Sequence, residues 1–133
     1  MNARLLIPLC ALALAACQRG DDAAPAPQIP PTEMAATHTP PPDYPMPLAC
    51  ANVGGTVLLQ VTVSRTGAPS NVRLLNSSGN DQLDQLAQAR VREWEFKAAT
   101  RNGQPITQTF QVPVNFTPPL ERPSECFALD AGR

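Results

Sequence analysis

Four cysteines and a single histidine are the side chains of this sequence best suited to nucleophilic or metal-ligand chemistry. The cysteines Cys10, Cys17, Cys50 and Cys126 are far apart, so none has the Cys-x-x-Cys spacing of a redox or zinc site. His38 lies in a proline-rich stretch, which argues against catalysis by a histidine base. The sequence contains no HExxH motif, glycine-rich phosphate loop or Ser-His pair. We therefore expect no enzyme activity, no metal site and no cofactor.

The first sixteen residues have the organisation of a targeting signal. Arg4 supplies the positive charge, and an apolar run of about 12 residues follows, too short for a membrane-spanning helix of about 20 residues. The run ends in "LAAC", which resembles a bacterial lipobox. This motif predicts that residues 1–16, including Cys10, are removed and that Cys17 is lipidated. An ordinary secretory signal cleaved elsewhere is the alternative.

Two cysteines then remain in the mature chain, Cys50 and Cys126. In an oxidising compartment outside the cytoplasm, two such cysteines usually pair, so we predict a disulfide between them. A loop of roughly 76 residues closed in this way would stabilise the fold by about 4 kcal/mol on the chain-entropy model. Two free buried thiols are the alternative.

Residues 17–43 have the composition of a linker. Nine of the sixteen prolines lie between Pro25 and Pro47, and the segment from Gln18 to Asp43 shows no hydrophobic period. We expect a disordered spacer whose roughly 26 residues reach at most ~80 Å. The net charge is −1 with no basic stripe, which excludes nucleic acid as a partner.

A domain is predicted to follow, over residues 44–133. Apolar side chains alternate through "GTVLLQVTV", which predicts a strand with one buried face. After the turn "RTGAP", the stretch "SNVRLLN" predicts a second strand, antiparallel to the first. Gly67 supplies a positive φ in this turn if one is needed.

A helix is predicted over residues 81–96, with Asn80 or Asp81 as its N-cap. Trp94 is expected to anchor this helix on the sheet. The carboxylates nearby have the spacing of a solvated helix face and not of a converging acid–base pair. The predicted apolar stripe consists of Leu83, Leu86, Ala87, Val91 and Trp94, and the predicted solvated carboxylates are Asp81, Asp84, Glu93 and Glu95.

The last predicted strand is "ITQTFQVPVNF", after a turn at Asn102-Gly103. Pro113 has no N–H, and proline is tolerated in a strand at an edge or a bulge, so this strand should border the sheet. The fold class is therefore α+β: a small three-stranded antiparallel sheet with one main helix packed on it. The exposed edge offers unpaired main-chain groups to an extended peptide.

In their order along the chain, these motifs resemble the C-terminal domain of the TonB energy-transducer family. The resemblance runs from about Pro41 to Phe116: a Tyr-Pro segment, a glycine-led strand, Ser-Ser-Gly, Leu-Asp, Trp-x-Phe, Gly-x-Pro and a closing Val-Pro-Val-x-Phe strand. Each motif is weak by itself, but their order is specific.

The resemblance implies a periplasmic domain that takes the TonB box, a short peptide of outer-membrane receptors, by strand addition to its last strand. Asp84, Trp94 and Phe96 match family positions with a structural role. A core-packing role is the alternative for Tyr44. The residues implicated in peptide binding are Tyr44, Pro45, Thr107, Thr109, Gln111, Pro113 and Asn115.

The chain also departs from the family pattern, because a lipid at Cys17 would replace the spanning helix of a full transducer. Gln18 follows this cysteine, and a residue other than Asp at that position favours the outer membrane. An outer-membrane anchor allows contact with receptors but not with an inner-membrane motor. We expect a passive, lipid-tethered module that binds receptors or other envelope proteins. The alternative is a structural envelope lipoprotein that uses the fold as a spacer or as a homodimerising unit.

Overall fold

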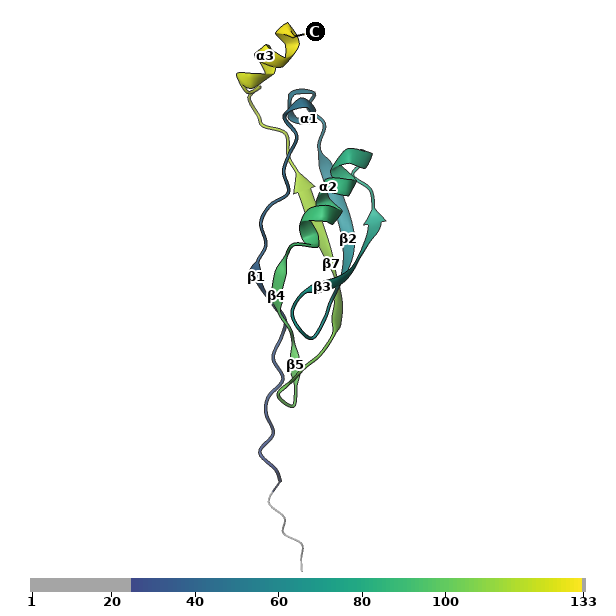
Figure 1. Cartoon of the computed structure of the whole chain (residues 1–133), viewed down its shortest axis with the longest axis vertical. Helices are drawn as coiled ribbons and strands as arrows, with labels where there is room; N and C mark the ends of the chain where they lie inside the picture. The colour runs from purple at the N-terminus through teal and green to yellow at the C-terminus, as the bar shows by residue number, and fades with distance from the viewer. Residues whose placement is uncertain (1–24, 133) are drawn as a thin grey trace, which may run out of the picture.

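The computed structural model describes residues 25–132, so the predicted signal and Cys17 lie outside the described residues. The domain is elongated, with α1 and α3 at one end and β5 towards the other, near which the described chain begins (Figure 1). The elements are β1 (Ala35–His38), α1 (Met46–Cys50), β2 (Gly55–Val63), β3 (Pro69–Asn76), α2 (Asp81–Val91), β4 (Glu95–Lys97), β5 (Thr100–Arg101), β6 (Gln104–Pro105), β7 (Gln108–Phe116) and α3 (Glu125–Ala131).

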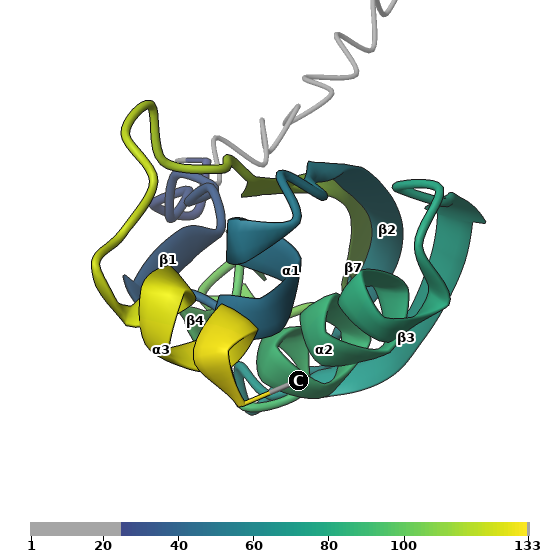
Figure 2. The same ribbon diagram turned by 90° about the horizontal axis from the view of Figure 1, so that it is seen from above.

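Three of the strands form the main sheet, in the order β3-β2-β7, and all neighbours are antiparallel. Along β2 and β7 the register runs without a break, from the pair Gly55 and Phe116 to the pair Val63 and Gln108. The helix α2 lies across one face of this sheet (Figure 2). The predicted α+β class, with three antiparallel strands and one main helix, is confirmed. Two short strand pairs, β1–β4 and β5–β6, add to it.

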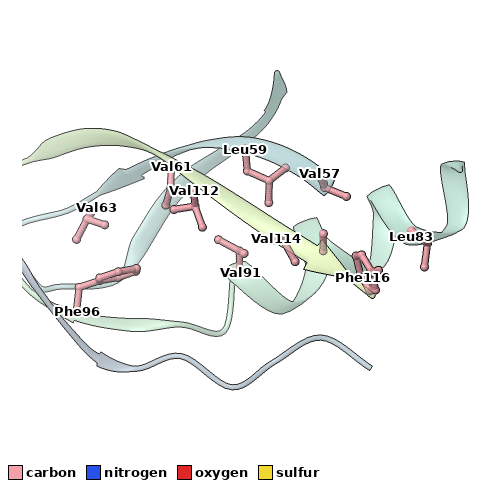
Figure 3. Packing of buried hydrophobic residues seen from close by; sticks show 11 residues of the cluster. Val57, Leu59, Val61, Val63, Leu83, Val91, Phe96, Val112, Val114 and Phe116 are labelled. Carbon is pink, nitrogen blue, oxygen red and sulfur yellow. The ribbon is translucent and has the colours of Figure 1, made fainter. Parts of the chain in front are cut away.

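The core lies between the sheet and α2, because the apolar side chains of each element share one face. In β2 the buried positions alternate with less buried ones, as a strand with one solvated face requires. Leu59 of β2 and Leu83 of α2 are fully buried. Figure 3 shows these side chains converging between the strands and the helix; the labelled residues are Val57, Leu59, Val61, Val63, Leu83, Val91, Phe96, Val112, Val114 and Phe116.

The predicted N-cap of α2 is confirmed at Asn80, whose side chain accepts a hydrogen bond from the Leu83 N–H. The helix ends at Val91, however, so its predicted extension to residue 96 is wrong. Trp94 lies beyond the helix, and its indole N–H donates to the Pro40 carbonyl at 2.9 Å. Glu95–Lys97 instead form the strand β4. Trp94 falls at a position that fits the helical period of α2, which is why the sequence predicts a longer helix. In the structure, residues 95–97 pair with the distant strand β1 instead of continuing the helix.

Asp84 is another correction, because it does not lie on a solvated face but is only 4% exposed. Its carboxylate accepts hydrogen bonds from the Ser77 hydroxyl and from both the N–H and the hydroxyl of Ser78, the last two at 2.8 Å. Burial alone raises the pKa of Asp84. The hydrogen bonds from Ser77 and Ser78 together outweigh burial, so the pKa lies below its ordinary value. The carboxylate therefore pins the loop before α2 to the helix.

Replacing Asp84 by asparagine is expected to destabilise the domain by roughly 1–3 kcal/mol at pH 7, because charge-assisted hydrogen bonds are lost. The folded pKa is lower than the unfolded one, so this stabilisation is present above the unfolded pKa and is lost as pH falls through the folded pKa. Urea unfolding at pH 7 and pH 3 should thus show a gap between wild type and Asp84→Asn that shrinks in acid. Asp81→Asn, in the same helical turn but exposed, is the control and should cost at most about 1 kcal/mol. An equal difference in unfolding free energy between wild type and Asp84→Asn at both pH values would contradict the stabilising role of the ionised Asp84 carboxylate.

The expected linker contains a strand. Ala35–His38 form β1, which pairs antiparallel with β4, Ala35 opposite Lys97 and Ala36 opposite Phe96. His38 is exposed, but it lies in this strand and not in a segment without secondary structure. Nothing in the composition of residues 35–38 signals the pairing, because it depends on a partner strand far away in the sequence.

Two turns use residues with a positive φ, as the sequence predicts. Asn102 and Gly103 have φ values of 52° and 76° and join β5 to β6. Gly67, with φ 87°, lies in the turn between β2 and β3. A Cβ atom at Gly67 would lie 1.9 Å from the Phe96 carbonyl oxygen, so only glycine lets this turn approach β4 so closely.

Candidate functional site

The outer side of β7 is an edge of the main sheet, because β7 is the last strand in the order and pairs only with β2 in the part of the chain that the structure describes. The orientation of its main-chain groups follows from two contacts. A Cβ atom at Gly54 would lie 2.4 Å from the Phe116 carbonyl oxygen, so this carbonyl faces β2. The Thr62 carbonyl accepts from the Ser70 hydroxyl of β3, so the main-chain groups of Thr62 face β3. Since these groups alternate along a strand, those of Val61 and Val63 face β7.

Because main-chain groups alternate along a strand, the other residues of β7 direct theirs away from β2. These are Thr109, Gln111, Pro113 and Asn115, four of the residues predicted to bind a peptide. The edge thus offers N–H donors at Thr109, Gln111 and Asn115, and a carbonyl acceptor at all four. Pro113 interrupts the row of donors, and its missing N–H removes no bond to β2.

The side chains of these four residues are exposed. Two are held by hydrogen bonds across the sheet: Thr109 to the Thr62 hydroxyl at 2.9 Å, and Asn115 to the Thr56 hydroxyl at 2.8 Å. They lie on the sheet face opposite α2, because the alternate side chains of β7 are the buried ones. The predicted residue Thr107 precedes β7, which begins at Gln108, and is not part of this row.

Tyr44 and Pro45, also predicted to bind a peptide, lie at the Phe116 end of β7. The Tyr44 ring packs edge-on against Phe116, with 5.6 Å between centroids, and its hydroxyl donates to the Val53 carbonyl. Burial raises the pKa of Tyr44. The Pro45 carbonyl accepts from the N–H of Leu48 and of Ala49 at the start of α1. In this structure both residues therefore hold the domain together, and Tyr44 has the packing role that the sequence left open.

The chain after β7 passes through Pro118 and Pro119 to α3, which lies beside α1 (Figure 1). The sulfur atoms of Cys50 in α1 and Cys126 in α3 are at bonding distance, with their Cα atoms 5.5 Å apart, and Cys126 is fully buried. This arrangement holds the start of α3 beside α1.

No group of three or more histidine, cysteine or acidic residues within 25–132 is placed to hold a metal ion. Among the helices of the described residues, none has the length and apolar character needed to cross a bilayer.

Comparison with known proteins identifies the family of this domain. The profile of the family described as "Gram-negative bacterial TonB protein C-terminal" matches residues 40–118, more than half of the chain. The chain belongs to the TonB C-terminal family. The match includes the segment from Pro40 to Pro45, the main sheet, α2 and β7, so the candidate edge lies inside the TonB-like part.

Two relatives named TonB align with this TonB-like part. "Protein TonB" of Xanthomonas campestris pv. campestris is 43% identical over 76 residues, which cover 57% of this chain and 34% of the relative. "Protein tonB2" of Pseudomonas aeruginosa is 40% identical over 79 residues, covering 59% of this chain and 29% of the relative. The chain thus spans about a third of the length of the curated relatives that it matches.

A solved structure agrees on the fold. The solution NMR structure of the Pseudomonas aeruginosa TonB CTD superposes with a TM-score of 0.58 over 68% of this chain and 91% of that chain, at 18% identity. At this identity the likeness concerns the arrangement of helix and strands, and it supports the TonB-like fold alone.

Proposed function

We propose that this protein is a TonB-like binding module of the cell envelope that takes an extended peptide by strand addition to the outer edge of β7. The observation that carries the proposal is the row of outward main-chain groups at Thr109, Gln111 and Asn115 on a strand with no second neighbour among the described residues. In strand addition, such groups supply the affinity, and alternate side chains supply the selectivity.

The partners that fit best are outer-membrane TonB-dependent receptors, through their TonB box. This inference rests on family membership, since the matching relatives are named TonB. It concerns the C-terminal domain only, because the chain matches about a third of those relatives. Other envelope proteins with an extended segment are the further candidates.

A lipid at Cys17 would hold this module at a membrane, and Gln18 favours the outer membrane. With residues 32–38 bound to the domain, about 14 residues, 18–31, separate Cys17 from the bound segment, and a chain of that length reaches at most ~43 Å. This short reach supports binding close to the anchoring membrane. It argues against a transducer that connects an inner-membrane motor to receptors across the periplasm.

The test of peptide binding is an NMR titration of the mature, anchored chain in detergent micelles with a synthetic TonB-box peptide. We expect saturable shifts of the Thr109, Gln111 and Asn115 amides, with the α2 amides unaffected. Absence of shifts at millimolar peptide, together with unchanged receptor-dependent uptake in a deletion strain, would support the structural-lipoprotein alternative instead.

Replacing Cys17 by alanine is expected to abolish lipidation, because the thiol is the acylation site of the predicted lipobox. The protein should then accumulate with its signal attached, and mass spectrometry of the wild type should show a diacylglycerol-modified N-terminal cysteine. Cys10→Ala, in the discarded segment, is the matched control and should be processed normally. Unchanged processing and membrane fractionation of Cys17→Ala would show that an ordinary secretory signal is present.

A further inference from the structure

The segment over residues 32–44, here called the strap, runs along the domain as an extended chain beside β4 (Figure 1). Its start is bound through Thr32, whose N–H and carbonyl exchange two hydrogen bonds of 3.1 Å with Thr100. The two threonine hydroxyls lie 2.8 Å apart. Between Thr32 and the proline-rich part of the strap, β1 pairs with β4. The segment thus behaves as a strand added to the β4–β5 region from the same chain.

The side of β4 that β1 covers can be identified from Phe96. Its N–H donates to the Gly67 carbonyl at 2.9 Å, so the main-chain groups of Phe96 face the turn between β2 and β3. By alternation, the groups of Glu95 and Lys97 face β1. Without the strap, β4 and Thr100 would present unpaired donors and acceptors, as a free edge does.

The two halves of the strap are held very differently. Near its end, Asp43 pairs with Arg90 at 2.8 Å, Pro40 accepts from the Trp94 indole, and Tyr44 packs on Phe116. By contrast, all four residues of β1 are exposed, and the register is irregular between Ala36 and His38. In this half, only Met34 packs against the core. Few buried contacts predict a low free energy of local opening.

We propose that the edge formed by β4 and Thr100 is a second strand-accepting site, which residues 32–38 of the same chain occupy and can vacate for an extended peptide of similar composition, rich in small and polar residues. This site is distinct from the β7 edge, and the proposal does not rest on the function of β7. Exchange would also release about seven residues of the strap and add ~22 Å to the reach of the tether. Peptide capture at β4 and tether length are thereby coupled.

The first test is amide exchange measured by NMR on the mature, anchored chain carrying Thr32→Pro and Ala35→Pro, which removes two strap donors. Protection of the Thr100 and Lys97 amides should fall at least about tenfold, because their acceptors lie in the strap. The Phe96 amide, bonded to Gly67, should keep its protection. Ala26→Pro, upstream of the strap, is the matched control. Unchanged protection of Thr100 and Lys97 in the double variant would overturn the proposal.

The second test adds a synthetic peptide with the sequence of residues 30–39 to the double variant. Protection of Thr100 and Lys97 should return with increasing peptide, and a peptide with proline at both substituted positions should have no effect. Failure to restore protection at millimolar peptide would also overturn the proposal. The wild type gives an independent readout if the double variant does not fold. There, excess peptide should shift the resonances of residues 32–38 to those of a free segment, and unchanged resonances count against exchange.

Discussion

Reduction of the predicted disulfide between Cys50 and Cys126 is expected to lower the free energy of unfolding by up to about 4 kcal/mol. The two cysteines are 76 positions apart, so the bond restricts most of the unfolded domain. It also joins α1 to α3, the helix that follows the last strand. Once released, α3 gains freedom in the folded state as well, which offsets part of the loss. The core between the sheet and α2 contains neither cysteine and should remain packed.

Urea unfolding followed by Trp94 fluorescence, with and without reductant, measures this change. The double variant Cys50→Ala with Cys126→Ala should unfold like the reduced wild type and should not respond to reductant. Thiol titration of the unreduced mature chain should find no free thiol at either position. Free thiols, with an unfolding midpoint that ignores reductant, would show that the two cysteines stay reduced.

The strands of the main sheet were predictable because a sheet with one buried face imposes a period of two. Val57, Leu59 and Val61 are buried while their neighbours are more exposed, and the alternation of apolar and polar residues in the sequence predicts this pattern. Pro113 indicated that β7 is an edge strand, because proline has no N–H to donate to a neighbouring strand. In the structure, the position of this missing N–H is on the side of β7 away from β2. The candidate site could therefore be predicted as a strand. Which of its residues direct their main-chain groups outward required the register.

The remaining features depend on partners that no local pattern records. Asp84 is charged, so its spacing on α2 suggests solvent exposure, yet the donors of Ser77 and Ser78 make its burial favourable. The Ser77-Ser78 pair before a helix N-cap was the available signal. The strap carries no such signal in its sequence, because the small and polar residues 35–38 become a strand only by pairing with β4. The predicted end of α2 is wrong for a related reason: residues 95–97 leave the helix to pair with β1.

Both candidate binding edges rely on main-chain groups, which side-chain truncation leaves intact. Proline substitution is therefore the informative change, since it removes a donor and places a ring carbon where the partner strand must approach. The effect of a proline depends on which way the main-chain groups of the replaced residue point. Where they point away from the sheet, proline blocks the edge; where they bond to the neighbouring strand, proline breaks the sheet.

Gln111→Pro is expected to weaken binding of an extended peptide to the β7 edge at least tenfold. The outward N–H of Gln111 is lost, and its ring obstructs the centre of the edge, whereas the bonds to β2 come from Phe110 and Val112 and persist. The nearby Pro113 shows that the strand tolerates proline at an outward position. Isothermal titration with a TonB-box peptide gives the affinity, and the thermal unfolding midpoint shows that the fold is retained.

Pro113→Ala is the matched opposite, because it supplies the missing donor in the middle of the same row. One added hydrogen bond of about 0.5–1.5 kcal/mol predicts peptide binding that is roughly 2- to 13-fold tighter, and also more self-association through the completed edge. If Gln111→Pro binds the peptide like the wild type while the shifts fall on Lys97 and Thr100, the peptide occupies the strap edge and not β7. Opposite effects of Gln111→Pro and Pro113→Ala can arise only if the partner strand pairs along β7, because both substitutions act on its outward donors and neither alters the ladder to β2.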